Sequence, residues 1–277
     1  MPDELDLGLD PVLARDFVMP SGDAFRRLVG VMAKLRAPDG CPWDQQQTHR
    51  SLARHLLEET YETLEAIEND DLAALREELG DLVLQVVFHS EIAFEEGAFS
   101  VADVLDDLRS KLIVRHPHVF GDVSVRDADE VHKNWERIKR DEKGSGVLDG
   151  IPAAMPALAR AAKVYRRAVG VGFEFASVED VVADLEDEVA ELRAEVVADE
   201  PDLERVSAEV GDVLFSAVSV AQRFGVEPET ALRTMLDRFS YRFRAVEAMA
   251  AADARELESL SLEEWQRYWE RAKGQTS

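Results

Sequence analysis

Cysteine is almost missing from this sequence. Its 277 residues include a single cysteine, Cys41, so no internal disulfide can form and no cysteine-based zinc site can be built. Uncharged apolar runs of about 18 residues are also missing, and residues 1–20 lack the basic start and apolar run of a secretory signal. We therefore expect a cytoplasmic protein that does not associate with a membrane.

Basic residues are scarce relative to acidic ones. The chain has 32 lysines and arginines against 57 aspartates and glutamates, which gives a formal net charge of −25. A surface this negative repels the phosphate backbone of a nucleic acid polymer, so we expect no binding of such a polymer. A small polyphosphate remains compatible, because a divalent metal held by carboxylates reverses the local charge.

Patterns typical of β-strands are nearly missing as well. Apolar residues recur three and four positions apart, as at Leu79, Leu82 and Val86, which is the period of a helix. Ser100 and Ser177 are each followed three residues later by an aspartate, a pattern that predicts the start of a helix. The fold class that we predict is all-α.

What the chain does contain is an internal repeat. Glycine and proline gather mid-chain in DEKGSGVLDGIP, which is typical of a linker, and the segments on its two sides match at a spacing of about 130 residues. The matches are WD at 43–44 with FE at 173–174, EETYE at 58–62 with DEVAE at 187–191, EELGDL at 77–82 with AEVGDV at 208–213, and WERIK at 135–139 with WERAK at 269–273. Ordered matches of this kind indicate two copies of one helical unit. We predict an N-terminal extension at 1–21, a first copy at 22–140, a linker at 141–156 and a second copy at 157–273.

Glutamates crowd one face of the helix expected around EETYE. Glu58 and Glu62 are four residues apart and Glu59 is three before Glu62, so they share a face beside an apolar stripe. In the next expected helix, Glu78 and Asp81 are likewise one turn apart. Only Glu58 among these acids has an arginine or lysine at helical spacing, so a bound cation would relieve their repulsion.

One such cluster in an acidic protein is ordinarily a solvated surface, but the second copy repeats it. Glu188 and Glu191 are followed by Glu209 and Asp212, and a glycine precedes the aspartate in both copies. This recurrence favours metal binding over plain surface charge. Ligands that offer only oxygen favour Mg²⁺ or Mn²⁺ over zinc or copper. A di-iron carboxylate centre ranks low, because no pair of Glu-x-x-His motifs supports it.

Together these motifs resemble the MazG family of nucleoside triphosphate pyrophosphohydrolases in its two-repeat form. The resemblance covers residues 22–273 and rests on CPWD at 41–44, the EExxE and ExxD motifs, RHPHVF at 115–120 and WERIK. It implies tandem all-α helical bundle units and a homodimer. It further implies that Mg²⁺ and a metal-activated water cleave nucleoside triphosphates between the α and β phosphates, giving nucleoside monophosphate and pyrophosphate.

The resemblance implies the metal ligands of both copies, and the chemistry of the neighbouring residues suggests further roles. The metal ligands would be Glu59, Glu62, Glu78 and Asp81 in the first copy and Glu188, Glu191, Glu209 and Asp212 in the second. The catalytic acids would be Glu58, Glu59 and Glu62, with Glu58 aligning or deprotonating the water. Phosphates would meet Lys111 and Arg115, matched in the repeat by Arg238 and Arg242. A nucleobase would stack on Trp135 or Trp269, although each lies in an amphipathic helix where a tryptophan is often a packing anchor.

The two copies are not equal. The second has Asp187 in place of the first glutamate of EExxE, and Asp184 adds an acid one turn earlier. We expect both changes to weaken nucleotide binding there without destroying the metal set, so the first copy is the cleaner candidate for catalysis, with the second still open. The alternative function is a non-catalytic helical interaction or nucleotide-sensing protein that keeps a structural metal site. It would bind Mg²⁺ and a nucleotide without releasing pyrophosphate.

Overall fold

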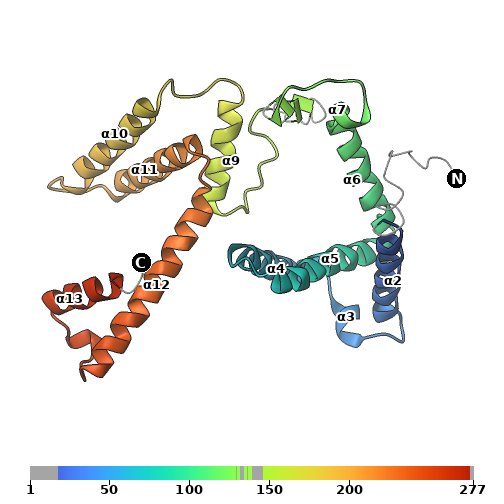
Figure 1. Cartoon of the computed structure of the whole chain (residues 1–277), viewed down its shortest axis with the longest axis horizontal. Helices are drawn as coiled ribbons and strands as arrows, with labels where there is room; N and C mark the ends of the chain where they lie inside the picture. Colours follow the sequence, from blue (N-terminus) through green and yellow to red (C-terminus); the bar gives the residue numbers. More distant parts are fainter. Residues whose placement is uncertain (1–17, 129, 132–133, 136, 139–145, 275–277) are drawn as a thin grey trace. The chain divides into compact units, whose positions relative to one another are not determined.

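Every regular element in the described part of the chain is a helix (Figure 1), which confirms the all-α prediction. The computed structural model describes residues 18–128, 130–131, 134–135, 137–138 and 146–274. Parts of the expected N-terminal extension, the WERIK segment and the linker lie outside the described residues. The chain divides into two compact units, Met1–Arg126 and Asp127–Ser277, while the repeat boundaries stay a prediction. Among the described helices, none has the length and apolar character needed to cross a membrane.

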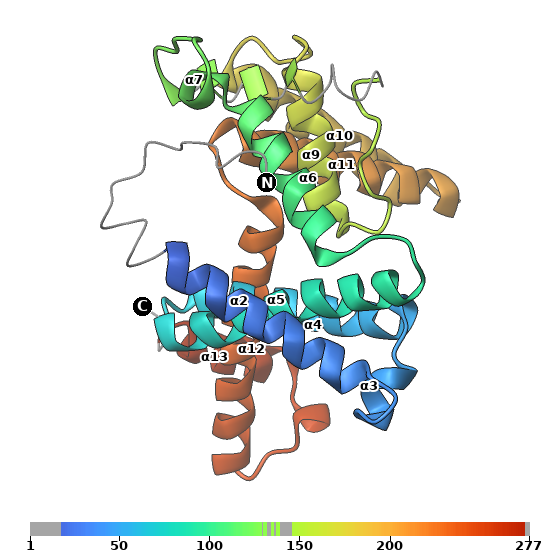
Figure 2. The same cartoon turned by 90° about the vertical axis from the view of Figure 1, so that its right-hand side faces the viewer.

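The first unit is built on a hairpin of two long helices. These are α4 (His49–Glu68) and α5 (Leu72–Glu95), which lie side by side in Figures 1 and 2. The helix α2 (Met19–Arg36) packs against α5 and against the short α3 (Pro42–Gln46). The helix α6 (Val101–Arg115) follows on α5, and α7 (Pro117–Phe120) follows on α6. The EETYE and EELGDL motifs therefore lie on two adjacent helices.

Local signals set the ends of these two helices. The Thr48 hydroxyl accepts a hydrogen bond from the backbone N–H of Ser51, whose side chain bonds back to Thr48, and this capping box starts α4. The carboxylate of Asp71 accepts from the first N–H groups of α5. Between them Asp70 adopts a positive φ of 53°, a conformation that aspartate tolerates better than most residues. This tight turn holds the acidic faces of α4 and α5 against each other.

A buried cluster and one arginine fasten the other helices to this hairpin. The cluster joins α2, α4 and α5 and consists of Met32, Leu52, Val87, Phe88 and Ile92. Burial of each large side chain contributes about 1.5 to 3 kcal/mol. Arg36 is 6% exposed and donates hydrogen bonds of 2.8 and 2.6 Å to the two carboxylate oxygens of Glu95. It also donates to the carbonyl of Asp44, which fixes α3 beside the end of α5.

The second unit repeats the hairpin and adds a second helix pair. The hairpin consists of α10 (Val178–Val196) and α11 (Leu203–Arg223), with α9 (Ala157–Val169) packed on α11. The helix α12 (Pro228–Ala252) contacts α9 and α11, and α13 (Leu262–Lys273) folds back on α12 after the short η2 (Leu257–Ser259), as Figure 1 shows. The DEVAE and AEVGDV motifs lie on α10 and α11, in the same arrangement as their counterparts in the first unit.

Candidate metal centres

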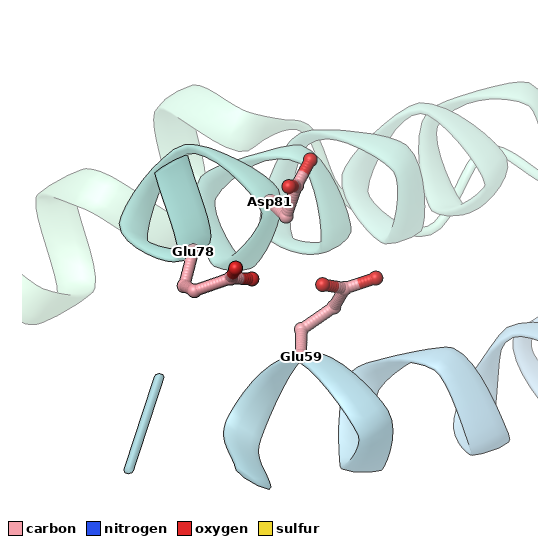
Figure 3. A group of neighbouring side chains, drawn as sticks. All are labelled: Glu59, Glu78 and Asp81. Atoms are coloured by element: carbon pink, nitrogen blue, oxygen red, sulfur yellow. The ribbon is translucent and has the colours of Figure 1, made fainter. Parts of the chain in front are cut away.

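Three carboxylates from two helices converge in the first unit. Glu59 on α4 and Glu78 and Asp81 on α5 each place one oxygen within 4.8 Å of the other two. Figure 3 shows Glu59 reaching from α4 toward the pair on α5. Oxygens that bind one Mg²⁺ lie at most about 4.2 Å apart, since each Mg–O bond is about 2.1 Å. The three groups are therefore close to the spacing of ligands to a single ion.

The pKa values of Glu59 and Glu78 are raised in this cluster. Partial burial is the main cause that raises the pKa of Glu59, followed by the negative charges of its neighbours, of which Asp81 contributes most. Burial also raises the pKa of Glu78, with the charge of Glu62 next in importance. A bound cation would reverse these shifts, because it favours the ionised carboxylates.

Two further glutamates of EETYE lie at the edge of the cluster. Glu62 is exposed, yet its charge reaches both Glu59 and Glu78. The side chain of Glu58 is 59% exposed, and its Oε2 lies 3.0 Å from Nδ1 of His55, one turn earlier on α4. The structure thus gathers three of the five predicted acids closely and leaves these two nearer to solvent.

The second unit holds a matching cluster between α10 and α11. Glu188, Glu209 and Asp212 each place one oxygen within 4.8 Å of the other two, and Asp212 is exposed. Burial, followed by the charge of Asp212, raises the pKa of Glu188. Glu191 is exposed, as Glu62 is in the first unit. The repeated motifs therefore produce the same grouping of carboxylates twice.

The surroundings of the second cluster differ from those of the first. Asp184, one turn before Glu188, accepts a hydrogen bond of 2.6 Å from the hydroxyl of Ser216. Ser216 is buried, so this bond ties α10 to α11 inside the hairpin. The charge of Asp184 also raises the pKa of Glu188. Asp184 therefore adds negative charge beside the cluster, as expected from the sequence.

The basic residues assigned to phosphate lie on other helices. On α6, Lys111 is exposed and Arg115 is half-buried; on α12, Arg238 is exposed and Arg242 is half-buried. In the described part of the second unit, α10 packs on α11 and α13 packs on α12 (Figure 1). The acids and the arginines of that unit therefore sit on different helix pairs, and the role of these arginines stays a prediction.

Trp269 lines an aromatic groove between α12 and α13. The groove has a volume of about 250 Å³ and is otherwise lined by Phe239, Phe243, Trp265 and Gln266. The ring centroid of Trp269 lies 5.1 Å from that of Phe239, and Trp269 also packs against the buried core of this helix pair. It is thus a packing anchor that still lines a groove. Trp135 is half-buried, and several of its neighbours lie outside the described residues.

Comparison with known proteins identifies the family. Residues 47–120 match the family model of the MazG nucleotide pyrophosphohydrolase domain. The Thermotoga maritima protein named nucleoside triphosphate pyrophosphohydrolase/pyrophosphatase MazG is 44% identical over 259 residues, which cover 92% of this chain and 97% of the relative. A nucleoside triphosphate pyrophosphohydrolase of Escherichia coli K12 is 41% identical over 257 residues, with 90% and 97% covered. This chain belongs to the MazG family.

The MazG match falls on the first hairpin. The matched residues contain the whole of α4 and α5, and with them the first acidic cluster. The sequence did not indicate that His55 would contact Glu58, although their spacing of three was visible. It carries no signal for the bond between Asp184 and Ser216, because that bond depends on how two separate helices pack.

Proposed function

We propose that this chain hydrolyses nucleoside triphosphates between the α and β phosphates, releasing nucleoside monophosphate and pyrophosphate. The observation that carries the proposal is the convergence of three carboxylates from two helices, repeated in both units. The names of the relatives support the same chemistry, since they are called nucleoside triphosphate pyrophosphohydrolases. The alternative of nucleotide sensing shares the metal site and differs only in the absence of turnover.

The acidic clusters suit Mg²⁺. In the first unit Glu59, Glu78 and Asp81 would hold the ion, with Glu62 at the edge of the site. The second unit offers Glu188, Glu209 and Asp212, with Glu191 in the place of Glu62. These donor sets consist of oxygen alone, which hard ions such as Mg²⁺ and Mn²⁺ prefer. When bound, the ion supplies positive charge that offsets the charge of the phosphate oxygens.

Glu58 is the residue that we assign to the attacking water. Its exposed carboxylate accepts one proton as the water oxygen bonds to the α phosphorus. The bond from that phosphorus to the bridging oxygen breaks at the same centre, and pyrophosphate leaves with the bridging oxygen. Glu58 then returns the proton to solvent, so no covalent intermediate with the protein is needed.

Substrate contacts outside the acidic hairpins come from the predicted basic and aromatic residues. Lys111 and Arg115 on α6, or Arg238 and Arg242 on α12, would pair with phosphate oxygens, because guanidinium groups bind phosphate through paired hydrogen bonds. The groove beside Trp269 has aromatic walls on which a nucleobase can stack. Trp135 keeps the same predicted role.

A second copy of the chain is the partner that we propose. The first hairpin exposes large apolar side chains beside its acids, among them Tyr61, Leu79 and Val83, which are 44%, 48% and 38% exposed. Large apolar side chains that stay exposed on two adjacent helices are typical of an interface. A symmetric homodimer would cover these side chains in both copies at once.

Pyrophosphate release tests the proposal directly. We would measure it with Mg²⁺ on a panel of standard and damaged nucleoside triphosphates, for the wild type, Glu59→Gln, Glu188→Gln and the double variant. Loss of release in the double variant is expected, and loss in one single variant would identify the working centre. Absence of release from the wild type on every substrate, with Mg²⁺ and nucleotide still bound, would favour the sensing alternative.

A further inference from the structure

We propose that His55 is a positioning residue that holds Glu58 in place as the water-activating carboxylate of the first centre. The inference rests on the proposed hydrolysis and goes beyond it, because it assigns a role to a residue outside the acidic motifs. It also separates the two centres, since only the first has a histidine at this place.

A hydrogen bond from Arg54 fixes which ring nitrogen of His55 carries the proton. Arg54 Nε donates to His55 Nε2 at 3.2 Å, so Nε2 must be the lone-pair nitrogen of the ring. The ring proton then lies on Nδ1, and this nitrogen is 3.0 Å from Glu58 Oε2. The order of Arg54, His55 and Glu58 therefore places the protonated nitrogen beside one carboxylate oxygen and leaves the other oxygen for water.

The His55 ring is itself held from a second element. The ring of Trp43, on α3, meets it edge to face with centroids 6.4 Å apart. Arg36 in turn holds α3 through the carbonyl of Asp44. The His55 side chain is 27% exposed, against 59% for Glu58. A freely exposed glutamate loses rotamer entropy when it is ordered, and contact with an already fixed ring reduces what must be ordered during the reaction.

His55 also lies beside the metal ligands. It is one turn before Glu59 on the same face of α4. The contact between His55 and Glu58 is therefore next to the cluster, where a water attacking a bound phosphate would have to sit.

The second unit has a different arrangement at the matching position. Aligning EETYE with DEVAE places Asp184 opposite His55 and Asp187 opposite Glu58. Asp184 accepts its hydrogen bond from Ser216 on α11. An ionised aspartate has no proton to donate, so it cannot orient a neighbouring carboxylate as a histidine does. The first centre is thus the one equipped to direct a base at water.

Histidine replacements that keep one or the other nitrogen test this role. The amide nitrogen of asparagine occupies the place of Nδ1, whereas that of glutamine occupies the place of Nε2. Glu188→Gln with Asp212→Asn silences the second centre, and His55→Asn, His55→Gln and Glu58→Gln are then compared in that background. Glu65→Gln, an exposed change on the same helix outside the motif, is the matched control.

We expect His55→Gln to lower kcat by about tenfold to a hundredfold with KM little changed, because it misplaces a group without removing a substrate contact. His55→Asn should keep most of kcat, and Glu65→Gln should match the background. The kcat of His55→Gln combined with Glu58→Gln should be no lower than that of Glu58→Gln alone, since both changes disrupt the same pair of residues. Equal damage from Asn and Gln, or losses that multiply with Glu58→Gln, would overturn the proposal.

A spectroscopic measurement on the unaltered chain needs neither substrate nor metal. Nitrogen-15 shifts of the histidine rings report which nitrogen carries the proton, and His55 should show the Nδ1–H form; the Nε2–H form would overturn the proposal. If the variant with Glu188→Gln and Asp212→Asn is inactive while the wild type is active, the proposal about His55 is also overturned. The proposed function would then remain intact. An inactive wild type would instead remove the proposed function, and this inference with it.

Discussion

The two acidic hairpins carry the same ligand grouping in different surroundings. In the first, His55 contacts Glu58; in the second, the matching Asp184 is bonded to Ser216. The position that matches Ser216 is Gln85, which is 5% exposed and whose amide oxygen has no hydrogen-bond partner among the described residues. The repeat has kept the three acids of each cluster and changed the residues one turn away from them.

In our proposal, metal binding and activation of the attacking water depend on different residues. Ligand spacing follows from two short motifs on adjacent helices, and both units have kept it. In our proposal, orientation of the base depends on neighbours such as His55 and Trp43, whose matching positions in the second unit hold other residues. We therefore expect the chain to bind an ion in both halves and to concentrate hydrolysis in the first.

Replacing one aspartate ligand in each unit gives the largest expected contrast. Asp81→Asn removes a charged oxygen from the first cluster. Losing a residue that only supports a metal ligand costs up to about a hundredfold in activity. We expect the loss of a direct ligand to lower pyrophosphate release by more than that. Asp212→Asn should leave most of the rate. Steady-state kcat at saturating nucleotide and Mg²⁺ measures both. Equal losses would contradict an unequal division of work between the centres.

The ion pairs that brace the two units give the next contrast. Arg36 is 6% exposed and bonds both oxygens of Glu95, whereas Arg223 is 30% exposed and makes one contact of 2.5 Å with Glu174. Arg36→Ala should lower the free energy of unfolding by about 1.5 to 3 kcal/mol, as for hydrogen bonds to a charged group. Arg223→Ala should cost less than about 1 kcal/mol, as for exposed pairs. Urea unfolding measures both changes in the free energy of unfolding. A larger decrease for Arg223→Ala than for Arg36→Ala would contradict this prediction.

Features set by neighbouring residues could be predicted from the sequence. Ser100 and Ser177 start helices as expected, because each hydroxyl bonds the backbone N–H three residues on and the aspartate there bonds back. The pairing of Glu78 with Asp81 follows from helical spacing alone. The meeting of these acids with Glu59 was expected because all of them border the apolar faces of two consecutive helices.

Features set by packing between helices could not be predicted. The rotation of α4 against α5 decides that Glu59 points into the cluster while Glu62 stays exposed, and a shared helical face does not distinguish them. The contact of Trp43 with His55 depends on where Arg36 fixes α3. Such contacts join residues through side-chain conformations that spacing does not determine.

Raised carboxyl pKa values make the stability of the hairpins depend on pH and on Mg²⁺. Unfolded glutamates ionise near 4.5, whereas Glu59 and Glu188 hold their protons to higher pH in the folded chain. Without metal, the free energy of unfolding should therefore fall as pH rises from 4.5 through the raised values. Mg²⁺ at about ten times its dissociation constant should add about 1.4 kcal/mol at neutral pH, and less in acid, where protons compete for the same oxygens.

Thermal unfolding in Mg²⁺ or in EDTA, at matched ionic strength, measures this dependence. Hydrogen exchange then separates the two hairpins. All three acids of the first cluster are half-buried, whereas Asp212 of the second cluster is exposed and its charge is better screened by solvent. We therefore expect Mg²⁺ to slow exchange in α4 and α5 more than in α10 and α11. Equal slowing of exchange in the two hairpins, or no slowing at neutral pH, would contradict the prediction that the first cluster responds more strongly to Mg²⁺.

The smallest expected effects come from Gln85 and Ser216, and they should differ in sign. Ser216→Ala leaves Asp184 without its donor, so we expect the free energy of unfolding to fall by about 1 kcal/mol. Gln85→Met keeps the volume and removes a buried oxygen that has no partner, so the change should be neutral or stabilising. Urea unfolding of both variants measures the difference. If Gln85→Met lowers the free energy of unfolding as much as Ser216→Ala does, the amide of Gln85 is hydrogen-bonded in solution. The side chains at this position would then be hydrogen-bonded in both hairpins.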